Sequence, residues 1–215
     1  RLEIWDGKRL KHEKMYKGEA LGVRAYVLFD LLRMYGSALE ENRGIPYVTQ
    51  YGMYVTPFST TGECYEKIIA DLKAAEQLLT EDESLLVYPR LPENMYDLFT
   101  SERVSHFNLY AVKATLARVY WTRGRAGDLD SAGMYAREVI ESGRFPLPSD
   151  GTTISSTHFI RCMGGTVNAD EAIFGLYVSN MYDNWSGELL LQSGGWLPAE
   201  PEMYKRRDDK FDYRN

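Results

Sequence analysis

The sequence has few of the residues that usually carry metal or thiol chemistry. Its 215 residues include three histidines and two cysteines. No two histidines have the i, i+4 spacing of a helical zinc site, so the sequence predicts no metal site. Cys64 falls on the apolar side of a predicted helix, which favours a packed core thiol over a nucleophile. The pairing of Cys64 with Cys162 and the redox compartment stay open.

The sequence also lacks an excess of positive charge and a long apolar run. It has 25 basic and 31 acidic residues and a formal net charge of -6. This balance argues against nucleic-acid binding, because binding to phosphate requires a basic surface. No stretch approaches the roughly 18 consecutive apolar residues of a membrane span. The chain begins at Arg1 without a secretion signal and ends abruptly at Asn215, which predicts a segment of a longer protein.

No arrangement of residues indicates catalysis or a cofactor. Acidic clusters at 81–83 and 208–212 are typical of a solvated surface. A glycosidase would need two carboxylates facing each other across a cleft. The glycine pairs at 164–165 and 194–195 lack the lysine or helix start of a phosphate-binding loop. We therefore expect a protein that is not an enzyme, with no catalytic residues and no cofactor. A segment of a helical glycoside hydrolase is the enzymatic alternative.

Four segments have the periodicity of amphipathic helices. Apolar residues recurring at three- and four-residue intervals predict helices over 18–35, 61–79, 104–123 and 129–142. Each helix has an expected inner face. In the order of the four helices, these faces consist of Leu21, Ala25, Leu28, Phe29, Leu32 and Tyr35; Tyr65, Ile68, Ile69, Leu72, Ala75 and Leu79; Leu109, Val112, Leu116 and Val119; and Ala132, Tyr135, Ala136, Val139 and Ile140. We also expect Trp121, on the third helix, in the core.

The helices are predicted to form antiparallel pairs. The short GRAGD link makes the third and fourth helices neighbours. Their small and aromatic residues resemble a tetratricopeptide (TPR) hairpin, although the link is about three residues too long. The residues that suit the pattern are Leu116, Ala117, Tyr120, Ala132 and Val139. The predicted fold is mainly α, with TPR-like antiparallel helix pairs, long irregular loops and little β structure.

Two regions follow from the change in composition after Pro146. Residues 1–146 are expected to form the TPR-like helical scaffold, and 147–215 the loop-rich start of a variable ligand-binding region. This second region is rich in Gly, Ser, Thr and Asn, with a strand predicted at 172–178. The stretch from 201 to 215 is predicted to begin another helix.

Aromatic residues in predicted loops are the main candidates for binding. Tyrosine occurs 16 times, and Tyr47, Tyr51 and Tyr54 lie in the long loop after the first helix. A sugar ring stacks its C–H face on an indole or phenol, and its hydroxyls bind Asn, Asp, Gln or Arg. The predicted stacking platform and its polar partners are Tyr182, Trp185 and Trp196, with Asn180 and Asp183. The alternative is that these rings only pin loops to the helices.

Several blocks together resemble the SusD/RagB family of outer-membrane nutrient-binding lipoproteins. The likeness lies in GEALGVRAYVLFDLLRMYG followed by GIPYVT, then YEKIIADLKAAEQLL, AVKATLARVYWTRG with GDLDSAGMYAREVIESGRFPL, and finally EAIFGLYV and EMYKRRDDKFDYR. These blocks stand in the family's order. Family members are usually at least twice as long, so the chain resembles a central portion, without the lipobox and with little of the C-terminal region.

The resemblance implies a non-catalytic cell-surface protein that binds oligosaccharide or polysaccharide. It further implies delivery of the glycan to a SusC-like TonB-dependent transporter, which the protein would cover as a lid. The expected location is the surface of the outer membrane, held only by a lipid anchor that lies outside this segment. The runner-up is a TPR-type protein–protein interaction scaffold without sugar binding, in which the aromatic residues belong to the core.

Overall fold

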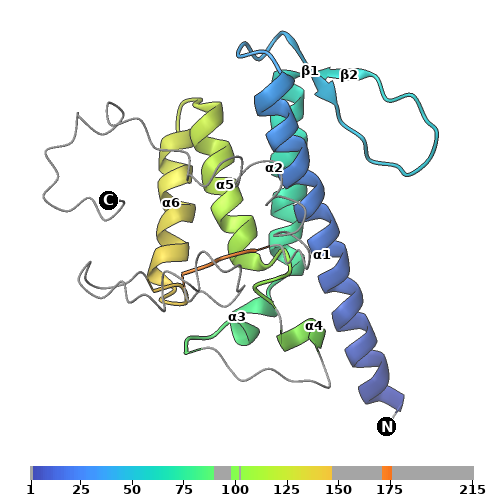
Figure 1. Cartoon of the computed structure of the whole chain (residues 1–215), viewed down its shortest axis with the longest axis vertical. Helices are drawn as coiled ribbons and strands as arrows, with labels where there is room; N and C mark the ends of the chain where they lie inside the picture. The colour runs from blue at the N-terminus through green and yellow to red at the C-terminus, as the bar shows by residue number, and fades with distance from the viewer. Residues whose placement is uncertain (1, 90–97, 102, 147–170, 176–215) are drawn as a thin grey trace, which may run out of the picture. The chain divides into compact units, whose positions relative to one another are not determined.

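The described part of the chain is built mainly from helices. The computed structural model in Figure 1 describes residues 2–89, 98–101, 103–146 and 171–175. These residues form six helices and one small two-stranded sheet, so the prediction of a mainly α fold with little β structure is confirmed. Most of the region 147–215, including the segment predicted to begin a further helix, lies outside the described residues.

Four long helices pack as two pairs. Helix α1 (Leu2–Tyr35) lies along α2 (Thr61–Leu78), and α5 (Leu109–Arg123) lies along α6 (Asp128–Glu141), while α2 and α5 join the pairs (Figure 1). The N-terminal half of α1 is rich in Lys, Glu and Arg and lacks an apolar stripe. The predicted start at residue 18 was therefore too late, because these residues favour a helical backbone although few apolar side chains besides Met15 are buried there.

Side-chain caps set the first residues of α2 and α5. Thr60 and Glu63 form a capping box at the start of α2, as each side chain accepts from the backbone N–H of the other residue. The side chain of Asn108 accepts from the backbone N–H groups of Tyr110 and Ala111. This cap explains why α5 begins at Leu109 and not at Val104, the predicted start.

The core lies between the apolar faces of these helices, largely as predicted. Its members include Ala25, Phe29, Leu32, Ile68, Leu72, Ala75, Val112, Leu116, Val119, Ala132, Tyr135 and Val139. Cys64 is also completely buried, and its thiol donates to the carbonyl of Ile45. Wherever the pattern predicted a continuous apolar stripe inside α2 and α5, the structure buries it.

Three residues expected in the core are exposed instead. Trp121 is 70% exposed, Ile140 77% and Tyr35 74%. At 100° per residue, Trp121 lies nearly opposite the stripe that runs from Leu109 to Val119, so its ring faces solvent. Ile140 is likewise about 100° from the centre of the buried face of α6. Tyr35 is the last residue of α1, beyond its contact with α2.

The small sheet lies inside a segment predicted to be an irregular loop. Strand β1 (Arg43–Pro46) pairs antiparallel with β2 (Phe58–Thr60). Gly44 allows β1 to run close to α2, because a Cβ there would lie 3.0 Å from Cys64 Sγ and from the backbone of Thr60. The pairing turns the residues between the strands into a hairpin loop that projects away from the helices (Figure 1).

The described part of the predicted strand at 172–178 has another form. Residues 172–175 are not in a strand, and the N–H of Gly175 donates to the carbonyl of Val104 at 3.0 Å. The amide of Asn108 donates to the carbonyl of Ile173 at 2.7 Å. The segment is thus held by the turn before α5 and not by a neighbouring strand.

A buried ionic cluster joins three parts of this unit. Two short helices, α3 (Asp82–Leu85) and α4 (Leu98–Ser101), follow α2 and precede α5 along the chain. Arg103, 1% exposed, binds Asp82 of α3, which is fully buried, and Glu19 of α1. Asp82 also accepts from the backbone N–H of Leu109, and His106 Nδ1 lies 3.0 Å from Glu19. The cluster therefore links α1, α3 and the start of α5.

Candidate functional site

The stacking platform predicted from the sequence cannot be located. Tyr182, Trp185, Trp196, Asn180 and Asp183 all lie outside the described residues. Their proposed role in binding therefore stays a prediction. The other group of loop aromatics, in the hairpin loop, belongs to the described part of the chain.

The hairpin loop, residues 47–57, presents bare aromatic and aliphatic side chains to solvent. Tyr51 and Met53 are fully exposed, Val55 is 97% exposed and Tyr54 70%. No charged residue occurs between Arg43 and Glu63 in a chain of which 26% is charged. Exposed apolar side chains grouped in this way are typical of binding surfaces.

The tip of the loop depends on Gly52. This residue has a φ of 138°, a conformation that residues with a side chain rarely adopt. A Cβ at this position would lie 2.6 Å from the ring of Tyr54. Gly52 therefore allows the Tyr54 ring to pack against the backbone of the loop.

Tyr47 anchors the other end of the loop to the helices. Only 4% of Tyr47 is exposed, and its hydroxyl donates to Asp71 Oδ2 at 2.6 Å. Arg24 of α1 donates to both oxygens of Asp71, at 2.8 and 2.7 Å. Burial, followed by the hydrogen bond to Asp71 and its charge, raises the pKa of Tyr47, so this phenol stays protonated. Tyr47 thus pins the loop to the helices, which is the alternative to sugar stacking that the sequence left open.

A hollow of about 730 Å³ opens where the loop meets α1; its wall is mainly apolar but includes several polar groups, for which we call it the polar hollow. Its lining residues include Arg24, Val48, Thr49, Gln50, Tyr51 and Met53. Bonding to Asp71 raises the pKa of Arg24, which keeps its guanidinium charged and fixed in orientation. The hollow thus combines a phenol ring with amide, hydroxyl and guanidinium groups. Such a mixture suits a ring that has both an apolar face and hydroxyls.

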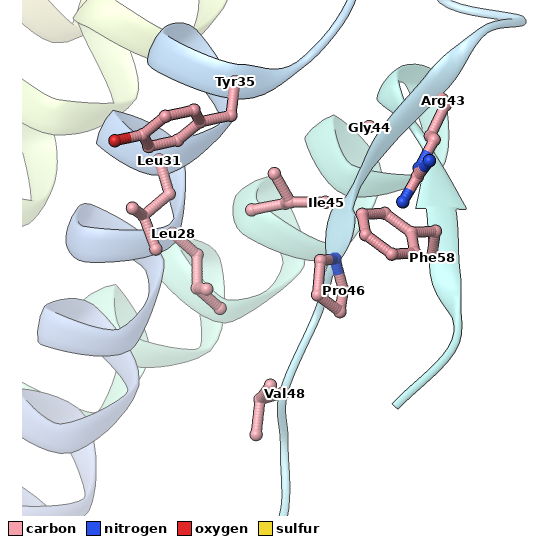
Figure 2. Close-up of a pocket in the computed structure, with 9 residues that line it drawn as sticks. All are labelled: Leu28, Leu31, Tyr35, Arg43, Gly44, Ile45, Pro46, Val48 and Phe58. Carbon is pink, nitrogen blue, oxygen red and sulfur yellow. The ribbon is translucent and has the colours of Figure 1, made fainter. Parts of the chain in front are cut away.

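An apolar groove lies next to the polar hollow, and Figure 2 shows it. It has a volume of about 550 Å³ and shares Val48 with the polar hollow. Leu28, Leu31 and Tyr35 of α1 line one side, and Ile45, Pro46 and Phe58 the other (Figure 2). The guanidinium of Arg43 stacks on the Phe58 ring at 3.6 Å from its centroid. The groove therefore suits an apolar group with one polar or anionic neighbour.

Within the described ranges, the residues supply binding groups and no metal-binding cluster. No group of three or more His, Cys, Asp or Glu side chains there could hold a metal ion. None of the helices in these ranges is long and apolar enough to span a membrane. What the hairpin region can do chemically is stack, donate hydrogen bonds and exclude water from a bound ring.

The comparison with known families identifies the chain. A family of SusD-like proteins, described as starch-binding and associating with the outer membrane, matches residues 2–121. The chain belongs to this SusD-like family. The match covers α1, the hairpin region, α2 and most of α5, and thus contains both the polar hollow and the apolar groove. A comparison with curated proteins found no match.

A solved structure shares the fold. A crystal structure of a protein from Bacteroides vulgatus, described as a candidate sugar-binding protein, is 21% identical with a TM-score of 0.54. The alignment covers 76% of this chain and 33% of the other one. The SusD-like chain therefore spans about one third of that protein's length. At this identity the likeness shows a common fold.

Sequence reasoning singled out the hairpin tyrosines and missed Arg24 and Gln50. Arg24 stands among the apolar residues of the first predicted helix, and only the tertiary structure brings it to Asp71 of α2 and to the loop. One signal was available: the run without charge from Gly44 to Gly62 marks this loop as unusual.

Proposed function

We propose that this SusD-like chain binds glycans non-catalytically, with the hairpin loop as one contact surface. The main support is a pair of exposed phenol rings, Tyr51 and Tyr54, on an uncharged loop beside a hollow with polar donors. A sugar stacks its C–H face only on an aromatic ring that is accessible, and groups that bind its hydroxyls fix its orientation. Gln50, Thr49 and Arg24 provide these groups.

The loop is suited to weak and exchangeable capture. Millimolar affinity corresponds to about -4 kcal/mol and micromolar affinity to about -8 kcal/mol. Two stacked rings with a few hydrogen bonds fall within this range. A protein that hands its ligand onward is served better by such an affinity than by a tight complex.

The region 147–215 supplies a second contact surface in this proposal. Trp185 and Tyr182, with Trp196, form the stacking platform, and Asn180 or Asp183 orients the hydroxyls. The motivation is their clustering in a polar segment. Calorimetric titration of the variant Trp185→Ala with an oligosaccharide that the native chain binds tests this surface. An unchanged affinity would remove Trp185 from the site.

The further role that we propose is delivery to a SusC-like TonB-dependent transporter at the outer-membrane surface. The family's association with the outer membrane supports this location, with a lipid anchor outside this segment. The apolar groove supports contact with a protein, because Leu28, Ile45 and Phe58 offer little to a sugar's hydroxyls.

The alternative function is a TPR-type scaffold that binds a protein and no sugar, and the apolar groove favours it. A glycan array probed with the 215-residue chain separates the two functions. Glycan binding that falls in the variant Tyr51→Ala is the expected result. An array without a single bound glycan would favour the scaffold and contradict glycan binding.

A further inference from the structure

The positive charge at the polar hollow is balanced by a neighbouring carboxylate. Its lining contains one charged side chain, Arg24, and the hairpin loop adds none. Arg24 is bound through two nitrogens to the carboxylate of Asp71, which is itself only 15% exposed. The hollow therefore faces an ion pair whose net charge is zero.

A second cation, Lys67, lies close to the ring of Tyr47. Lys67 Nζ is 5.8 Å from the centroid of the Tyr47 ring and donates to Ser59 Oγ at 2.7 Å. Arg24 stands over the same ring at 6.0 Å. Lys67 is not among the residues that line the hollow, so Arg24 is the cation that a bound ligand meets.

The ion pair leaves hydrogen-bond donors available. A guanidinium has five N–H groups, and Asp71 accepts from two of the nitrogens, Nε and Nη2. The hydroxyl of Tyr47 also interacts with the guanidinium, and the N–H groups that neither Asp71 nor Tyr47 engages remain for a ligand. Because two hydrogen bonds to Asp71 hold the guanidinium in place, its remaining N–H groups keep a fixed orientation in a residue that lines the hollow.

We propose that the Arg24–Asp71 ion pair makes the polar hollow selective for uncharged glycans over glycans that bear carboxylate or sulfate groups. This inference rests on the glycan-binding function proposed above. Hydroxyl oxygens accept from the free guanidinium N–H groups without requiring a counter-charge. A ligand carboxylate must give up its hydration and meets a cation whose charge Asp71 already neutralises.

A matched pair of ligands tests this selectivity. The 215-residue chain is first screened on an array that carries neutral α-glucans, β-glucans, xylans and mannans beside glycans with uronate or sulfate groups. The strongest ligand is expected to be neutral. Its derivative with primary hydroxyls oxidised to carboxylates is then titrated, and we expect its affinity to be lower by about tenfold.

The variant Asp71→Asn tests the role of the pair directly. It leaves the Arg24 charge without a partner, so we expect the oxidised ligand to gain about tenfold relative to the neutral one. The control Asp130→Asn makes the same change of net charge on an exposed residue of α6. It should leave the ratio of the two affinities unchanged.

Each outcome decides between the two proposals. If no glycan binds, the proposed function fails. If glycans bind but the oxidised ligand binds as well as the neutral one, or the ratio in Asp71→Asn equals that in the native chain, glycan binding stands and the selectivity is wrong. Circular dichroism checks the fold of Asp71→Asn. If Asp71→Asn is unfolded, the double variant Arg24→Gln/Asp71→Asn, which has neither charge, takes its place. We expect the double variant to bind both ligands about equally. A retained preference of about tenfold for the neutral ligand would overturn the role of the pair.

Discussion

Single residues show most clearly where burial changes the energy of a charge. Asp82 is fully buried and Arg103 nearly so, whereas the pair formed by Glu40 and Arg125 is about one third exposed. Removing one partner of a buried pair leaves the other charge without compensation, while an exposed pair exchanges its partner for water.

We therefore expect Asp82→Asn to lower the free energy of unfolding by about 1.5–3 kcal/mol, because Arg103 loses one charged hydrogen-bond partner and keeps Glu19. The matched change Glu40→Gln should lower it by less than about 1 kcal/mol, because that pair is exposed. Urea denaturation of both variants provides the comparison. Similar losses in the two variants would show that the buried cluster is not a main source of stability.

Glu19 gives this cluster a dependence on pH. Burial of Glu19 acts to raise the pKa of its carboxyl, but the hydrogen bond with His106 and the charge of Arg103 outweigh burial, so the pKa falls below its ordinary value of 4.5. A carboxyl with a lowered pKa in the folded state stabilises the fold above its unfolded pKa. That stabilisation is lost as pH falls through the folded pKa.

Unfolding free energies measured from about pH 6 down to about pH 3 should therefore fall more steeply in the native chain than in Glu19→Gln. The variant cannot release or bind a proton at this position. Two profiles that stay parallel over the whole range would mean that Glu19 makes no such contribution.

At the scale of an element, two caps of different strength can be compared. Thr60 is half-buried and its side chain caps α2 through one hydrogen bond, which is exposed to solvent. Asn108 is fully buried, accepts from two N–H groups and donates to the carbonyls of Arg103, His106 and Ile173. Asn108 thus caps α5 and also holds the segment 171–175.

Thr60→Ala is expected to cost about 1 kcal/mol of stability. Asn108→Ala should cost more, about 2–4 kcal/mol, since it also leaves buried carbonyls without donors. Thermal unfolding followed by circular dichroism measures both losses. An equal loss in the two variants would mean that the donor side of Asn108 adds nothing.

The same elements show what the sequence could predict. Helices with a continuous apolar stripe, such as α2, were predicted to within a residue, because burial and local periodicity agree there. The sheet was not, since β1 and β2 are short and β1 lies close to α2 and β2 at Gly44, a contact that local sequence does not reveal. Trp121 was misplaced because residue type was given more weight than its angle on the helix. In the hairpin loop, the tyrosines were predicted from the sequence to be loop aromatics and candidates for binding. The pairing of Arg24 with Asp71 was not predicted, because it depends on the packing of α1 against α2.

At the scale of the whole described unit, glycines of α1 control how closely helices approach. A Cβ on Gly22 would lie 2.4 Å from Cδ1 of Phe107, which is only 2% exposed and has little room to move. A Cβ on Gly7, in the same helix, would contact nothing within 4 Å among the described residues. The two positions differ in packing and share the helical backbone.

Gly22→Ala should therefore destabilise the fold by about 1–3 kcal/mol through overpacking, despite the better helix propensity of alanine. Gly7→Ala should stabilise it by up to about 1 kcal/mol, because only the propensity changes. Chemical denaturation of the two variants tests this contrast. Stabilisation by both substitutions would contradict the close contact between α1 and the turn before α5.

The central claim is that exposed tyrosines of the hairpin loop hold a glycan. Calorimetric titration with the strongest array ligand, comparing the native chain with Tyr51→Ala/Tyr54→Ala, tests it most directly. Losing two stacked rings should weaken binding by about 2 kcal/mol, or roughly thirtyfold. The control Tyr88→Ala removes an exposed tyrosine outside the loop and should bind as the native chain does. Equal affinity in the native chain and the double variant would contradict the claim.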